Sequence, residues 1–234
     1  MKRLLTLSAL LLAQSALAGP VADFETAYRA AYADYRQALF ATNAGDAAAS
    51  AAARSALSDR WTALRDRWEA APPPHFEGDP GFADTLAQVA WLINRSSGLI
   101  AEGNLHAAHE TLEAIRDELS ALHTRNRIET FSDRMNAYHA EMEHVLATDL
   151  STLDAAAVAG LRERAALLDY LARDILSEPP PEGRNNPAYD ALTVPFAASA
   201  AAFLAAARAG DPAAIRAAVK GLRKPYAMLF VKFG

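Results

Sequence analysis

The stretch APPPHFEGDPG, residues 71–81, returns in altered form as SEPPPEGRNNP at residues 177–187. The proline triplets of the two stretches are 107 positions apart. Proline disfavours a helix interior, so each stretch predicts a loop between helices. The same offset, without a gap, pairs Phe24 with Phe131, Leu39 with Leu146, Leu64 with Leu171, Pro80 with Pro187, Gly103 with Gly210, Arg116 with Arg223 and Leu122 with Leu229. The mature chain is therefore predicted to contain two copies of one unit.

Four helical segments are predicted in each unit, because alanine is abundant and β-branched runs are few. Those of the first unit are expected at residues 23–43, 46–70, 80–101 and 104–126. Those of the second unit are expected at residues 132–147, 151–177, 187–209 and 212–232. A capping side chain precedes a proline in Asp79-Pro80, Asn186-Pro187 and Asp211-Pro212. Gly103 and Gly210 suit the left-handed residue that ends a helix.

Four amphipathic helices with a long central loop suit an antiparallel four-helix bundle. The predicted fold is all-α, with two tandem antiparallel four-helix bundles related by the repeat of 107 residues. The first bundle is assigned to residues 19–127 and the second to residues 128–234. The alternative is a single domain of eight helices with one merged core.

The first eighteen residues, MKRLLTLSALLLAQSALA, have the form of a cleaved secretory signal peptide. Two cations precede a short apolar run, and Ala16-Leu17-Ala18 forms the cleavage site. The run is shorter than the roughly twenty apolar residues of a membrane-spanning helix, and no membrane span is expected after it. The mature protein is therefore expected in the periplasm.

Composition excludes several classes of function. The chain has no cysteine, which rules out disulfides and covalent haem bound through a C-x-x-C-H motif. Its formal net charge is −5 and it has no basic cluster, which argues against binding to nucleic acid or anionic lipid. It also lacks a nucleophile elbow, a phosphate-binding glycine loop and an H-E-x-x-H motif, so the protein is not expected to be an enzyme.

The ends of the two units, LSALHTRN at residues 119–126 and YAMLFVKF at residues 226–233, occupy the place of a haem-attachment motif. In this respect the chain resembles the cytochrome c-prime superfamily of exported four-helix bundles. The first unit keeps His123 at the position of the family's iron ligand, whereas the second unit has Phe230 there and both lack the cysteines. The resemblance implies a bundle fold descended from a haem protein. It leaves a non-covalent b-type haem, held by Met135 and His123, as a minor alternative.

Met135, His139 and Met142 lie four and three residues apart, so they share one face of the first helix of the second unit. Thioether and imidazole groups together prefer Cu(I). If residues 124–133 turn the chain back, His123 comes alongside and supplies a fourth ligand. The equivalent positions of the first unit, 107 residues earlier, are Tyr28, Tyr32 and Tyr35. This asymmetry favours a metal site.

A bundle core is the other interpretation of the same helix. Phe131, Met135, Tyr138, Met142 and Val145 also have the spacing of a core stripe, and methionine often fills core gaps. A second histidine group, His106 and His109, lies among glutamates and could chelate a harder ion such as zinc. A solvated acidic helix face is favoured for that group.

The predicted function is a periplasmic copper carrier or buffer at the junction of two helical bundles. Its predicted ligands are Met135, His139, Met142 and His123, and its partner is expected to be an envelope metalloprotein or transporter. The alternative is a metal-free helical module that binds another protein of the cell envelope.

Overall fold

The computed structural model describes residues 19–234, and the predicted signal peptide, residues 1–18, lies outside the described residues. Helices make up most of this part, and it contains no strand. They are α1 (Pro20–Asn43), α2 (Ala47–Trp68), α3 (Phe82–Ala101), α4 (Leu105–Arg125), α5 (Phe131–Leu146), α6 (Ala155–Ser177), the 3-10 helix η1 (Pro181–Gly183), α7 (Pro187–Ala209), α8 (Pro212–Lys220) and α9 (Arg223–Phe233). The all-α prediction is confirmed.

Most predicted helix ends have the expected caps. The side chains of Asn186 and Asp211 accept hydrogen bonds from the first amides of α7 and α8. Gly103 and Gly210 are left-handed, with φ of 77° and 69°. Asp79 differs, because its carboxylate accepts bonds from Gly81 N, Arg125 Nε and Asn126 Nδ2 at 2.9, 2.7 and 2.7 Å. These bonds hold the chain in a loop, and α3 begins only at Phe82.

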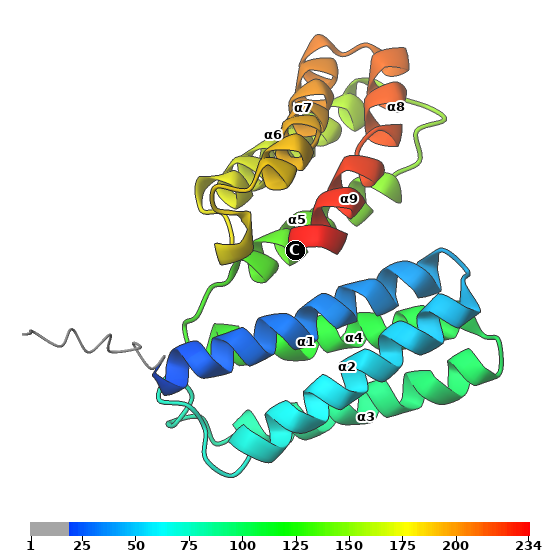
Figure 1. Cartoon of the computed structure of the whole chain (residues 1–234). Coiled ribbons are helices and arrows are strands. Elements are labelled where there is room, and N and C mark those ends of the chain that lie inside the picture. The colour runs from blue at the N-terminus through cyan, green and yellow to red at the C-terminus, as the bar shows by residue number, and fades with distance from the viewer. Residues whose placement is uncertain (1–18) are drawn as a thin grey trace, which may run out of the picture.

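The helices form two groups that follow each other along the chain (Figure 1). Helices α1 to α4 pack on one another and are called the first half. Helices α5 to α9 pack on one another and are called the second half. Buried apolar side chains of both halves belong to one continuous cluster. The boundary between residues 127 and 128 therefore stays a prediction.

The prediction of one helix over residues 212–232 is wrong. Helix α8 ends at Lys220 and α9 begins at Arg223. Pro225 is the reason, because it has no N–H to donate to the carbonyl of Gly221 and its ring would clash with that carbonyl in a continuous helix. The offset of 107 places Glu118 at the equivalent position of α4, which runs on without a break.

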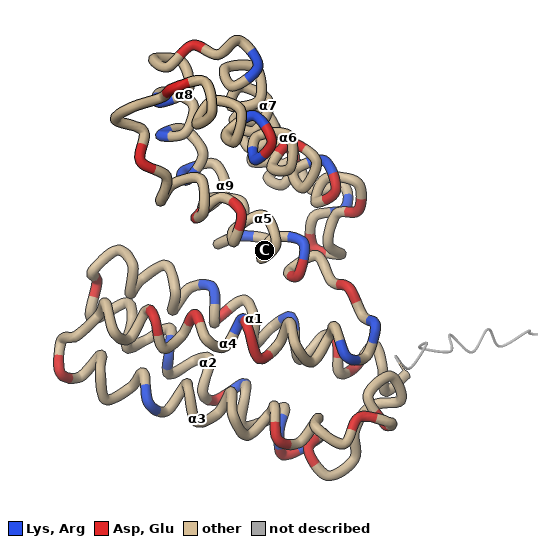
Figure 2. Tube along the Cα trace, turned by 180° about the vertical axis from the view of Figure 1, so that it is seen from behind, with Lys and Arg blue, Asp and Glu red and all other residues tan. Residues whose placement is uncertain are grey.

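Acidic and basic side chains are interspersed over both halves (Figure 2). Several form exposed ion pairs, such as Arg60 with Asp34 at 2.6 Å and Arg223 with Glu143 at 2.9 Å. Among the described helices, α7 is long and apolar enough to cross a membrane, a test that the core helix of a water-soluble protein also passes. In this structure its Phe196 and Phe203 are fully buried against other helices.

The two halves meet where α1 crosses α9. Arg36 of α1 is only 9% exposed, and it donates hydrogen bonds to the carbonyl oxygens of Val231, Lys232 and Gly234. These carbonyls lie at the C-terminal end of α9, where the helix dipole also favours a cation. Arg36 thus holds the end of the second half against the first.

Replacing Arg36 with methionine is expected to lower the free energy of unfolding by about 1.5–3 kcal/mol, the usual contribution of hydrogen bonds from a charged donor. Urea denaturation measures the change. Arg29→Met is the matched control, since Arg29 also lies on α1 and joins the halves, but through an exposed pair with Glu182 that should contribute about 1 kcal/mol or less. Equal effects of the two variants would contradict the assigned role of Arg36.

Candidate functional site

The three predicted ligands on α5 have different surroundings. Met135 is 0% exposed and Met142 is 1% exposed, and both lie in the core with Tyr138 and Val145. His139 is partly exposed and faces the first half, where Glu113 lies across the seam. The burial of the methionines fits the core interpretation of this helix.

His123 does not join the Met135, His139 and Met142 face. Residues 126–130 do turn the chain back, but the His123 ring bonds through Nδ1 to both carboxylate oxygens of Asp133, at 3.0 and 2.9 Å. Asp133 and Met135 are two residues apart, which is about 200° around a helix, so they leave α5 on nearly opposite sides. His123, the expected fourth ligand, therefore lies on the side of α5 that faces away from Met135.

Asp133 is also the third residue of a capping box with Thr130, which begins α5. Burial opposes ionisation of Asp133, but the bonds from His123 and Thr130 hold the pKa of this carboxyl below its ordinary 3.8. A carboxyl whose pKa is lowered by folding stabilises the folded state at pH values above its ordinary pKa. This contribution is lost as the pH falls through the lower pKa of the folded state.

Asp133→Asn is expected to lower the free energy of unfolding by about 1.5–3 kcal/mol at pH 7. The difference from the wild type should begin to shrink below pH 3.8, where Asp133 of the unfolded chain takes up a proton, and should be lost once the pH falls through the lower pKa of the folded state. Urea denaturation at several pH values measures both effects. A difference that does not change with pH would contradict a stabilising Asp133 carboxylate.

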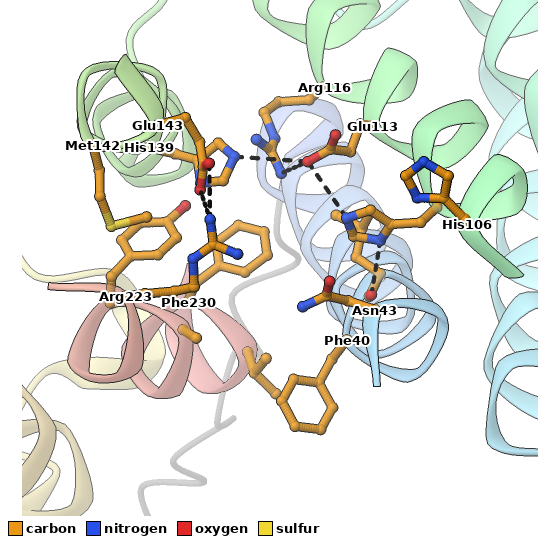
Figure 3. Close-up of a pocket in the computed structure, with 15 residues that line it drawn as sticks. Phe40, Asn43, His106, Glu113, Arg116, His139, Met142, Glu143, Arg223 and Phe230 are labelled. Carbon is orange, nitrogen blue, oxygen red and sulfur yellow. Dashed lines mark hydrogen bonds and ion pairs between the residues drawn. The ribbon is translucent and has the colours of Figure 1, made fainter. Parts of the chain in front are cut away.

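A cavity of about 320 Å³ lies at the seam between the halves. Figure 3 shows its walls, which come from α1, α4, α5 and α9. Its polar lining consists of Asn43, His106, His109, Glu113, Arg116, His139, Glu143, Arg223 and Tyr226. Leu39, Phe40, Met142, Phe230 and Val231 supply most of its apolar wall.

Glu113 of α4 is the centre of the polar lining. Its Oε1 atom lies 3.6 Å from His109 Nε2, 3.6 Å from His139 Nε2 and 3.7 Å from Arg116 Nη2. The polar contact with His139 lowers the pKa of Glu113 against the effect of burial, and the nearby Arg116 adds to the shift. Glu113 is therefore ionised at neutral pH.

His109 presents an unprotonated nitrogen to this carboxylate. Its Nδ1 atom lies 3.1 Å from the carbonyl oxygen of Leu39, which can only accept a hydrogen bond, and 3.1 Å from Thr42 Oγ1, whose hydroxyl donates to the carbonyl oxygen of Ala38. Nδ1 therefore carries the proton. Burial lowers the pKa of His109 from its ordinary 6.5, so the ring is neutral and Nε2 bears a lone pair. Two acceptors, Nε2 and Glu113 Oε1, thus face each other at 3.6 Å with no donor between them.

On another side of the cavity, donors lack acceptors. Arg116 Nε and the Tyr226 hydroxyl are buried and make no hydrogen bond. The Tyr35 hydroxyl, which lies beside Arg116, has no bond of normal geometry either. Burial raises the pKa of Tyr226, so its hydroxyl keeps its proton. The Arg116 guanidinium also lies over the Phe230 ring, 5.7 Å from its centre.

The mouth of the cavity is open to solvent. The His106 side chain is 86% exposed and Phe40 is 47% exposed. Arg223 and Glu143 form an ion pair there (Figure 3). No group of three or more His, Asp or Glu residues within residues 19–234 has the arrangement of a metal site.

Sequence reasoning placed His139 and Met142 in a functional site, and both line the cavity. It predicts a solvated acidic helix face for His109 and its glutamate neighbours, Glu113 among them, with a zinc chelator as the alternative, and it assigns no site role to Arg116 or Tyr226. One signal was available, since the offset of 107 pairs Arg116 with Arg223 and both arginines line the cavity.

Comparison of the chain with protein-family models, with curated proteins and with solved structures finds no significant match.

Proposed function

We propose that this chain is a ligand-binding protein that holds the carboxylate of a small molecule in the cavity between its two halves. One observation carries the proposal. The Arg116 guanidinium and the Tyr226 hydroxyl line the cavity, and each has a buried donor without an acceptor. Buried polar groups are almost always hydrogen-bonded. A ligand in the cavity can supply the missing acceptors once these two side chains turn toward it.

A carboxylate fits these donors well. Charge-assisted bonds from arginine to a carboxylate are among the strongest hydrogen bonds in proteins. The nearest protein carboxylate, Glu113, lies 3.7 Å from Arg116 Nη2 and also faces two histidines, so it leaves Nε of Arg116 unpartnered. A volume of about 320 Å³ is at the small end of ligand sites, which range over roughly 300–1,000 Å³.

Calorimetric titration with 4-methylpentanoate tests the proposal, because this acid joins a carboxylate to a short apolar chain. The wild type is expected to bind it at one saturable site. Tyr226→Phe should weaken binding about tenfold, since it removes one hydrogen bond to a charged group. Tyr138→Phe is the control, because Tyr138 is also a buried phenol without a partner but does not line the cavity. Absence of saturable binding, or equal loss in both variants, would contradict the proposal.

The copper function predicted from the sequence remains an alternative proposal. Its support is that His139 and Met142 line one cavity. The other two predicted ligands, Met135 and His123, do not line it. Titration with Cu(I) against a competing chelator tests it. Tight binding that Met142→Leu and His139→Ala both abolish would favour copper over a carboxylate ligand.

We also propose that the two halves are tandem four-helix units that arose by duplication. The offset of 107 supports this, with α8 and α9 together taking the place of α4. Descent from a relative of cytochrome c-prime and export to the periplasm are part of the same proposal. Mass spectrometry of the protein from the envelope fraction tests export, which predicts an N-terminus at Gly19.

A further inference from the structure

The acceptor-rich side of the cavity has no role in binding a simple carboxylate. His109 Nε2 and Glu113 Oε1 are both acceptors, and they lie 3.6 Å apart. A carboxylate placed at Arg116 would also bring a second negative charge close to Glu113. Both features call for a cationic donor on the ligand.

We propose that the ligand is an α-amino acid with an apolar side chain, whose ammonium group is bound by Glu113 and His109 beside the carboxylate at Arg116 and Tyr226. This inference rests on the proposed carboxylate site and adds the second charged group. An ammonium group has three donors, and a nitrogen can lie about 2.8–2.9 Å from each of two acceptors that are 3.6 Å apart.

Charge balance supports a zwitterion. Arg116 and Glu113 carry one positive and one negative charge, so the inner part of the free cavity is neutral at pH 7 when its histidines are neutral. A zwitterion keeps this balance and gives each protein charge an opposite partner. A bare carboxylate leaves the cavity with an uncompensated negative charge, which costs free energy in a partly buried site.

An ammonium group fits the acceptors better than a metal ion does. A protein metal site normally has three or more ligands, and the described residues contain no such set. Arg116 also lies 3.7 Å from Glu113 Oε1, so a cation bound by this carboxylate lies near the guanidinium, which repels a divalent ion more than a singly charged ammonium group.

The apolar part of the wall indicates the side chain of the amino acid. Leu39, Met142, Phe230 and Val231 face the cavity, and Phe40 stands at its open side. These groups offer no hydrogen bond to a polar side chain. Leucine and residues of similar size are therefore the expected ligands.

The test compares three probes by calorimetry: L-leucine, 4-methylpentanoate, which lacks the amine, and 3-methylbutylamine, which lacks the carboxylate. Wild-type protein is expected to bind L-leucine at least tenfold more tightly than either analogue. Glu113→Gln should remove the preference for L-leucine over 4-methylpentanoate, whereas Tyr226→Phe should weaken both acids by a similar factor. Glu110→Gln is the control, because Glu110 lies on the same helix with its side chain 64% exposed.

The outcomes separate the two proposals. Binding of 4-methylpentanoate without tighter binding of L-leucine would overturn the amino-acid inference and leave the carboxylate site standing. A preference for L-leucine that persists in Glu113→Gln would overturn the role of Glu113. If that variant does not fold, as thermal unfolding will show, His109→Phe replaces it and should reduce the preference in the same way. Failure of every probe to bind would overturn both proposals.

Discussion

Arg116→Met is expected to weaken carboxylate binding about a hundredfold or more. Truncation of one partner in a buried, hydrogen-bonded charge pair typically costs 2–5 kcal/mol or more, and 1.4 kcal/mol corresponds to a factor of ten. Methionine fills much of the space of the apolar arginine stem, so the variant should fold. Glu113 keeps its two histidine neighbours. Calorimetric titration with 4-methylpentanoate measures the loss.

Arg164→Met is the control for the loss of one positive charge. Arg164 forms an exposed ion pair with Glu141 and lies outside the lining of the cavity. The control should bind 4-methylpentanoate within a factor of two of the wild type. A fall in affinity of less than tenfold in Arg116→Met would show that the guanidinium is not the main contact of the ligand.

Phe196→Ala is expected to lower the free energy of unfolding by about 3–5 kcal/mol, the usual cost of removing a buried phenyl ring. Phe196 of α7 is 0% exposed, and its ring packs edge-on against Tyr138 of α5 at 4.8 Å. Because natural domains are stable by only about 5–15 kcal/mol, this change takes away a large part of the total.

Urea denaturation, followed by circular dichroism, measures the effect of Phe196→Ala. The matched control is Tyr170→Ala on α6, because Tyr170 is aromatic but 61% exposed and should change stability by about 0.5 kcal/mol or less. A loss below 1.5 kcal/mol in Phe196→Ala, roughly the cost of a conservative core change, would contradict the packing of α7 on α5.

The helices were largely predictable because their ends carry local signals. Asn186, Asp211, Gly103 and Gly210 cap their helices as expected, since a cap depends on neighbours only a few residues away. The break before α9 was also readable from Pro225. The repeat gives no warning of it, because Glu118 occupies the equivalent position of the first unit.

The candidate site was less predictable, because it depends on how the halves meet. Periodicity placed Met135, His139 and Met142 on one face of α5 but could not show that the methionines turn into the core while His139 reaches the seam. Arg116 and Tyr226 are far apart in the sequence and come together only when α4 and α9 line one cavity. No local sequence pattern predicts such a pair.

Nuclear magnetic resonance of arginine side chains can decide whether the cavity binds a carboxylate. Protein labelled with ¹⁵N-arginine is titrated with 4-methylpentanoate while the Nε–H signals are recorded. One signal is expected to shift downfield in a saturable manner, and Arg116→Met should lack that signal, since Arg116 Nε is the buried donor without an acceptor in the cavity lining. If no arginine signal shifts, or if the shifting signal persists in Arg116→Met, the cavity is not the carboxylate site.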